Sequence, residues 1–176
     1  YNPNNALFRV CNDGNLQPNE SSYINPDHHQ YFRFAGRVVA LAIYNEELLD
    51  VSFTQAFYKQ ILGLDLCYTD MEHINPEYYK NLNWILSNDI VELGLDLTFS
   101  VEADIFGELK QVELLPGGKE IVVDESNKQT YVQLVTELRM KKSIQPQTDS
   151  FLQGFDDVIP LDFIRIFTET ELGLLV

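Results

Sequence analysis

The sequence is poor in cysteine and in basic residues, and it has no long apolar run. Cys11 and Cys67 form no CxxC or CxxH pair, so we expect unlinked thiols of an intracellular protein rather than a disulfide. Lys and Arg number 12 against 27 Asp and Glu, a formal net charge of −15. This balance disfavours nucleic acid and anionic membranes as partners, because each phosphate contact needs a cation. It is consistent with a basic protein partner or simply with a solvated acidic surface.

Motifs for metal, nucleotide or nucleophilic chemistry are missing as well. No HExxH, GxGxxG, GxxxxGK[ST] or GxSxG occurs. His28 and His29 are adjacent and should project to different sides of a helix, and His73 stands alone. Neither cysteine has a neighbouring base to activate it. We therefore expect no catalytic residue, no metal site and no cofactor, and a binding module rather than a self-sufficient enzyme.

The chain has enough apolar material to fold. Its 176 residues are 45% hydrophobic and 12% aromatic, which suits one domain, or one domain made of two subdomains, and argues against disorder. No apolar stretch approaches the roughly 20 residues that span a bilayer. The chain starts without methionine and stops in an apolar tail at residues 173–176. We expect it to be a piece of a longer protein.

The pattern predicts helices in the first third. Residues 6–10 read as a short strand within a loop rich in Asn, Pro and Gly. A helix is expected over 25–49, apolar almost all round and broken by Arg33 and Arg37. Residues 52–55 match a capping box that should start a second helix, which ends at Gly63.

Residues 75–89 are the most informative stretch. Asn75 and Pro76 are typical of a helix start. Apolar and aromatic residues then follow two helical stripes, and Trp84 lies outside both. A helix of this kind has one face for its own core and a second face that packs elsewhere or meets a partner.

Strands and further helices are expected after this helix. Residues 95–101 alternate between apolar and polar, as in a half-buried strand, and residues 112–115 and 120–123 should add two more strands. Turns are expected at 106–107 and 116–118. Helices should follow over 127–142, 147–158 and 160–167, and a last one should start from a capping box at 168–171.

Eleven segments of the chain carry motifs of a known family. They are residues 29–37, 53–63, 70–72, 76–82, 84–89, 97–102, 114–118, 127–132, 151–155, 159–160 and 167–172. Together these segments resemble the HECT-type ubiquitin ligases. They cover essentially the whole chain in the family's order, which is more specific than any single motif. The resemblance implies an α+β, mainly helical fold, the N-terminal lobe of a HECT domain, with a small subdomain made of a helix and three strands.

The family likeness also implies a division of labour along the chain. Residues 1–66 and 143–176 would belong to the large subdomain, and residues 67–142 would form the small subdomain that docks a ubiquitin-conjugating enzyme. The family's catalytic cysteine lies in a C-terminal lobe, in a sequence context that neither Cys11 nor Cys67 matches. The resemblance therefore implies no catalytic residue here, and transfer of ubiquitin through a cysteine elsewhere in the parent protein.

The matching positions imply a docking groove for a phenylalanine of the conjugating enzyme. The implied groove residues are Tyr78, Asn81, Leu82, Trp84 and Ile85 of the helix, Leu95 and Leu97 of the first strand, and Tyr131 and Val135 of the following long helix. Tyr31 and Phe106 match a second surface that would face ubiquitin. The other interpretation is that the groove residues simply form the core of the small subdomain.

The expected function is thus recruitment of a ubiquitin-loaded conjugating enzyme by a transthiolating ligase of the cytoplasm and/or nucleus. Its partners would be that enzyme, ubiquitin, and substrate proteins bound through regions outside this chain. One alternative is a non-catalytic interaction module with a HECT-like fold. Another is a free-standing hydrolase using Asp and His, which the residue spacings do not favour.

Overall fold

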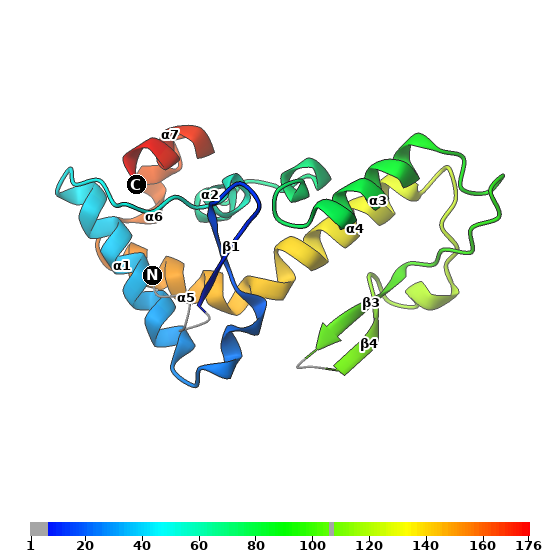
Figure 1. Ribbon diagram of the computed structural model, residues 1–176, viewed down its shortest axis with the longest axis horizontal. Coiled ribbons are helices and arrows are strands. Elements are labelled where there is room, and N and C mark those ends of the chain that lie inside the picture. The colour runs from blue at the N-terminus through cyan, green and yellow to red at the C-terminus, as the bar shows by residue number, and fades with distance from the viewer. Residues whose placement is uncertain (1–6, 106–107) are drawn as a thin grey trace. The chain divides into compact units, whose positions relative to one another are not determined.

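Two compact units make up the chain in the computed structural model, which describes residues 7–105 and 108–176 (Figure 1). The terminal unit joins Tyr1–Leu66 to Lys141–Val176, and the middle unit is Cys67–Met140. Both units contain helices and a small sheet, so the α+β class predicted from the sequence is confirmed. The sequence placed the second boundary after residue 142, and the assignment of these units to the family's subdomains stays a prediction.

The terminal unit is mainly helical. Its elements are β1 (Phe8–Val10), β2 (Leu16–Pro18), η2 (Glu20–Ile24), α1 (His28–Tyr44), α2 (Gln55–Leu62), η5 (Lys142–Ile144), α5 (Gln145–Asp156), α6 (Leu161–Ile164) and α7 (Glu169–Leu175). β1 pairs antiparallel with β2, and a single parallel bridge joins Leu16 to Phe53. Among the described residues, no helix is long and apolar enough to cross a membrane.

Two glycines let α1 and α5 pack backbone against backbone. A Cβ atom on Gly36 would lie 2.0 Å from the carbonyl oxygen of Phe151, and one on Gly154 would lie 1.8 Å from that of Arg33. Real Cβ atoms never approach so closely, so any side chain here would force the helices apart. The two sequence segments that form the terminal unit are therefore in contact at two glycines, Gly36 of α1 and Gly154 of α5.

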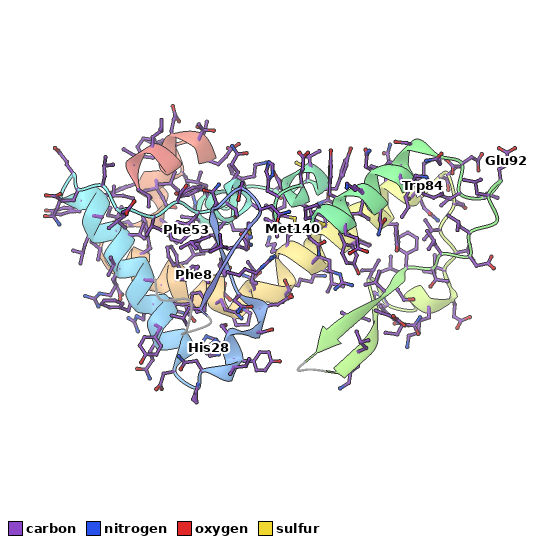
Figure 2. All side chains as sticks on the ribbon, viewed as in Figure 1. Phe8, His28, Phe53, Trp84, Glu92 and Met140 are labelled. Carbon is purple, nitrogen blue, oxygen red and sulfur yellow. The ribbon has the colours of Figure 1, made fainter. Side chains whose placement is uncertain are left out.

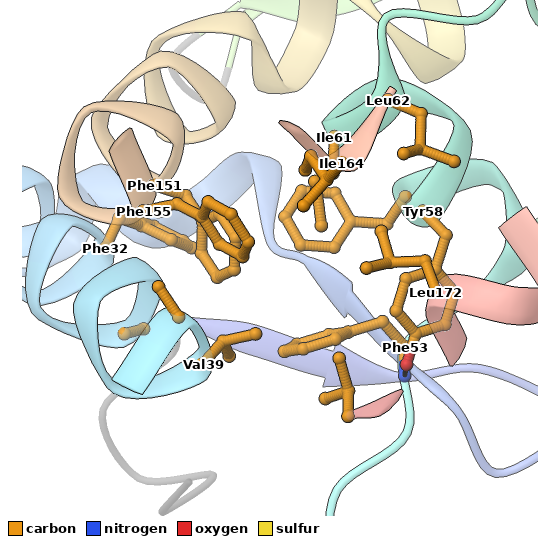
Figure 3. Packing of buried hydrophobic residues seen from close by; sticks show 14 of the residues in the cluster. Phe32, Val39, Phe53, Tyr58, Ile61, Leu62, Phe151, Phe155, Ile164 and Leu172 are labelled. Atoms are coloured by element: carbon orange, nitrogen blue, oxygen red, sulfur yellow. Dashed lines mark hydrogen bonds between the residues drawn. The ribbon is translucent and has the colours of Figure 1, made fainter. Parts of the chain in front are cut away.

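Aromatic rings fill the core of the terminal unit. Phe32, Phe53, Phe57, Phe151 and Phe155 are at most 1% exposed. The rings of Phe53, Phe57 and Phe151 meet edge to face, for example Phe53 with Phe151 at 6.0 Å between centroids (Figure 3). Helices α1, α2 and α5 and the segment before α2 each supply a ring, so this cluster ties together segments far apart in the sequence.

Two helix ends of the terminal unit were predicted correctly, the stop of α2 at Gly63 and the start of α7 at Thr168, and the others differ by a few residues. The helix expected to run to residue 49 ends at Tyr44, because Glu46 turns to a left-handed φ of 58°. The predicted cap Ser52 is wrong: Thr54, in an extended conformation, caps α2 by accepting from the Phe57 amide. The stop at Gly63 is confirmed by its φ of 72°.

Later helix bounds differ by a few residues from those predicted. The helix expected over 147–158 is α5, Gln145–Asp156, and the one expected over 160–167 shortens to α6. The capping box that starts α7 is confirmed, with Thr168 and Glu171 bonded reciprocally. Hydrogen bonds from the Thr168 backbone and hydroxyl lower the pKa of Glu171.

The middle unit combines two helices with a hairpin. Its elements are η3 (Tyr68–Met71), α3 (Pro76–Ser87), β3 (Ser100–Ile105), β4 (Glu108–Glu113), η4 (Gly118–Glu120) and α4 (Lys128–Met140). Helices α3 and α4 lie side by side, and β3 pairs antiparallel with β4 (Figure 1). The turn predicted at residues 106–107 lies outside the described residues.

The prediction of three strands is wrong. The first strand begins at Ser100, so Leu95 and Leu97 lie before it and not in it. Residues 120–123 form no strand within the described part of the unit, but one antiparallel bridge joins Thr98 to Val122. The main reason is local: the amide of Leu95 donates to the Ile90 carbonyl at 3.1 Å, which winds residues 90–95 into a turn. An alternating pattern cannot distinguish such a turn from the start of a strand.

A buried polar cluster surrounds the start of α1. The Nδ1 atom of His28 lies 3.0 Å from the Ser22 hydroxyl, which also accepts from the Gln147 side-chain amide at 3.1 Å. Because the hydroxyl accepts from Gln147, its own hydrogen is available to donate to Nδ1 of a neutral His28. The rings of His28 and His29 lie 4.0 Å apart, so the expectation that they diverge is wrong. Burial, helped by His29, lowers the pKa of His28.

Stability should therefore fall when the solution is acidified through the histidine range. The unfolded chain binds a proton near pH 6.5, while folded His28 resists protonation, so the unfolded state gains protons first. The contribution of His28 is fully present above pH 6.5 and is lost progressively below it. Urea unfolding between pH 7.5 and 5.5 measures this slope. We expect His28→Gln to flatten the slope and His29→Gln to leave most of it, and an unchanged slope in His28→Gln would contradict the assignment.

Candidate partner-docking surface

Helix α3 has an inward and an outward face, and its start is set locally. The side chain of Asn75 accepts from the Tyr78 amide at 3.2 Å, and Pro76 takes the first helical position, as the sequence predicted. Leu82 and Ile85 are buried, whereas Trp84 is 45% exposed. The helix therefore presents an aromatic side chain to solvent while its aliphatic side chains enter the unit.

The structure divides the nine predicted groove residues into two groups. Leu82, Ile85, Tyr131 and Val135 are at most 9% exposed and belong to the core of the middle unit. Tyr78 and Leu97 are half-buried, and Asn81, Trp84 and Leu95 are exposed. The second group can meet a partner directly, while the first supports it from beneath. Binding by these residues stays a prediction.

Of the two residues matched to a ubiquitin-facing surface, Tyr31 lies in the described part of the chain and Phe106 does not. Tyr31 lies on α1 in the terminal unit and is 44% exposed. Phe106 lies outside the described residues. A role of either residue in contacting ubiquitin stays a prediction.

A compact turn follows α3. The Asp89 carboxylate accepts from the amides of Val91 and Glu92 at 3.1 and 3.0 Å. Ile90 is fully buried, and its amide donates to the Glu125 carboxylate at 3.0 Å. One buried side chain thus anchors the turn, and its neighbours are turned outward.

Lys128 fixes the same turn to the start of α4. Its Nζ atom donates to the Asn88 carbonyl at 2.9 Å and pairs with Glu125 at 2.5 Å. The carbonyl belongs to the residue that ends α3, where the helix dipole favours a cation. Because Lys128 is largely buried, this contact is better shielded from solvent than an ordinary surface ion pair.

Sequence reasoning missed two exposed apolar residues of this turn. Val91 is 59% exposed and Leu93 is 56% exposed. We call these two residues, together with the exposed Trp84 and Leu95, the Trp84 surface; they lie along the end of α3 and the segment that follows it. Trp84 is labelled on α3 in Figure 2. The sequence signal was an apolar run that alternates at Val91, Leu93 and Leu95, next to the equally apolar Ile90. Such a run gives no indication of which member is buried.

A cation–π contact lies elsewhere in the unit. The guanidinium carbon of Arg139 on α4 lies 4.4 Å from the centre of the Tyr78 ring on α3. The same group donates to the Tyr78 hydroxyl and to the backbone carbonyl of Glu102 on β3. Tyr131 is buried nearby against Phe99, ring centres 5.7 Å apart, and burial raises its pKa.

The two thiols are not arranged for catalysis. Cys11 and Cys67 are not linked in a disulfide, as predicted. Cys11 is buried, and burial raises its pKa, whereas exposed Cys67 has its sulfur 3.5 Å from the Asp70 carboxylate. In the part of the chain that the structure describes, no group of three His, Cys, Asp or Glu could hold a metal ion.

Comparison with known proteins decides the family. The model of the HECT domain (ubiquitin-transferase) matches residues 1–176. The chain belongs to the HECT family. The resemblance seen in its sequence motifs is therefore confirmed.

The HECT relatives are large proteins. The chain is 55% identical to E3 ubiquitin-protein ligase HACE1 of Danio rerio over 176 residues, which is 99% of this chain and 20% of that protein. It is equally similar to HACE1 of Homo sapiens, of which it spans 19%. It is 46% identical to E3 ubiquitin-protein ligase HUWE1 of Mus musculus over 100% of this chain and 4% of that protein. The HECT chain thus spans about a fifth or less of these relatives.

Proposed function

We propose that this HECT chain recruits a ubiquitin-conjugating enzyme for a ubiquitin ligase, and that the Trp84 surface is where the enzyme docks. Tyr78, Asn81 and Leu97 would border the contact. In this proposal ubiquitin passes from the bound enzyme to a cysteine elsewhere in the parent protein and then to substrate lysines. The support is family membership, together with relatives that are E3 ubiquitin-protein ligases.

The observation that carries the proposal is the exposure of Trp84. A tryptophan that is 45% exposed on a helix with buried aliphatic residues is poorly explained by folding alone. Aromatic side chains surrounded by smaller apolar ones are typical of binding hot spots. Carboxylates of Glu92 and Asp96 lie along the same segment and favour a partner with basic residues beside its apolar contact.

The contribution of these residues to transfer would be positional. Trp84, Val91 and Leu93 would bind the enzyme through apolar contact, and the buried Ile90 would keep the turn in shape. Holding the loaded enzyme near an acceptor on the same protein converts a bimolecular encounter into an intramolecular one. No bond of the transfer itself needs to be made or broken by the residues of this surface.

Replacing Trp84 with alanine should weaken enzyme binding by about 30-fold, which corresponds to about 2 kcal/mol for loss of a hot-spot aromatic. Calorimetric titration of the chain with a panel of ubiquitin-conjugating enzymes measures this change. Phe163→Ala is a matched control, because Phe163 is 69% exposed and lies in the terminal unit. It should bind as the wild type does.

Two results would contradict the proposal. The first is absence of binding across the panel by a chain whose circular dichroism and unfolding show that it is folded. The second is equal weakening by Trp84→Ala and Phe163→Ala, which would indicate nonspecific adhesion of exposed aromatics. In the first case the non-catalytic interaction module would become the better interpretation.

A further inference from the structure

We propose that Arg139 is a positioning residue for partner docking, because it holds the Tyr78 ring in the orientation that a partner meets. This inference rests on the proposed function. It adds a residue on α4 that neither the sequence motifs nor the surface exposure identify. Arg139 itself need not touch the partner.

The guanidinium of Arg139 joins three elements of the middle unit. It lies 4.4 Å from the Tyr78 ring centre and donates to the Tyr78 hydroxyl, both on α3. It also donates to the Glu102 carbonyl on β3. A single group therefore contacts both the face and the tip of one aromatic side chain while it is itself fixed to the hairpin.

This pairing restricts the Tyr78 side chain. Tyr78 is only half-buried, so packing alone leaves part of its ring free to change rotamer. A contact at the ring face and a hydrogen bond at the hydroxyl, both from one planar group, select one orientation. A side chain ordered before binding loses less entropy on binding, which improves affinity without adding a contact.

Lysine could not replace arginine in this role. Both hydrogen bonds of Arg139 come from one nitrogen, Nη2, and an ammonium that donated to the same two oxygens would lack the planar guanidinium face that lies over the Tyr78 ring. Arg139→Lys therefore keeps the charge on α4 and most of the apolar stem. It should free the Tyr78 ring while leaving the core of the unit largely intact.

A double-mutant cycle tests whether Arg139 acts through Tyr78. We expect Arg139→Lys to weaken binding of a ubiquitin-conjugating enzyme by about tenfold, with little change in the thermal unfolding midpoint. In a Tyr78→Ala background the same change should have no further effect, because the ring that it positions is gone. Arg165→Lys is a matched control, since Arg165 is an exposed residue of the terminal unit, paired with Asp162. It should leave binding unchanged.

A second measurement reports the conformation of the Tyr78 side chain in the absence of a partner. NMR of the free chain should show a single χ1 rotamer for Tyr78 in the wild type and averaging between rotamers in Arg139→Lys. A single rotamer in both proteins would overturn the positioning role. So would equal enzyme binding by wild type and Arg139→Lys, or independent effects of the two changes in the cycle. If the folded wild type binds no enzyme at all, it is the proposed function that fails, and the docking role fails with it.

Discussion

Replacing Phe53 with alanine is expected to lower the free energy of unfolding by about 4 kcal/mol, within the range for truncation of buried aromatic residues. Phe53 is 1% exposed, and its ring centre lies 5.3–6.0 Å from those of Phe8, Phe57, Tyr58 and Phe151. Loss of the ring would open a cavity between three separate segments. Because proteins of this size are stabilised by only about 5–15 kcal/mol, such a loss removes a large share of the total.

Urea denaturation followed by circular dichroism measures the Phe53→Ala effect. Phe34→Ala is the matched control, because Phe34 is 65% exposed on α1 and its truncation should change stability by less than about 0.5 kcal/mol. Similar losses in the two variants would show that the aromatic cluster is not the main source of stability in the terminal unit.

Gly154→Ala should be nearly as damaging, although it adds only one methyl group. The new Cβ would meet the Arg33 carbonyl oxygen at 1.8 Å and its carbon at 2.7 Å. These are backbone atoms, which cannot turn aside as a flexible side chain can. Alanine favours a helix by about 1 kcal/mol over glycine, but separating α1 from α5 should cost more, leaving a net loss of about 2–3 kcal/mol.

Two comparisons make the glycine prediction specific. Gln153→Ala, at an exposed neighbouring position of α5, should be close to neutral. Gly36→Ala should behave like Gly154→Ala, because its Cβ would lie 2.0 Å from the Phe151 carbonyl oxygen. Stabilisation by either glycine replacement would mean that the two helices are not in backbone contact in solution.

Features set by neighbouring residues could be predicted from the sequence. The start of α3 at Asn75, the stop of α2 at Gly63 and the capping box at Thr168 all depend on residues a few positions apart. Each has a local hydrogen bond or backbone conformation as its cause, and each has a characteristic residue type. The family motifs made predictions possible along the whole chain, and the family assignment was confirmed.

Features set by distant residues could not be predicted in this way. The alternation indicated a strand from Leu95, but the Leu95 amide closes a turn on the carbonyl of the buried Ile90, and extended pairing starts later, where the Val123 amide donates to the Leu97 carbonyl. The Glu125 carboxylate, which accepts a hydrogen bond from the Ile90 amide in that turn, lies 35 positions later in the sequence. Likewise, Arg139 and Tyr78 are 61 positions apart, and no spacing rule connects them. These contacts belong to the packing of the unit and have no signature in a local pattern.

The division into one continuous and one interrupted unit has a consequence for how the protein is made. The middle unit, Cys67–Met140, is contiguous, so all of its residues have been synthesised before α5 begins. The terminal unit cannot complete its fold until α5 has left the ribosome, because α1 packs on α5 at Gly36 and Gly154. During translation the aromatic residues of α1 and α2 therefore remain without their final neighbours. For a nascent chain, this interval is the period of greatest exposure to aggregation and to chaperones.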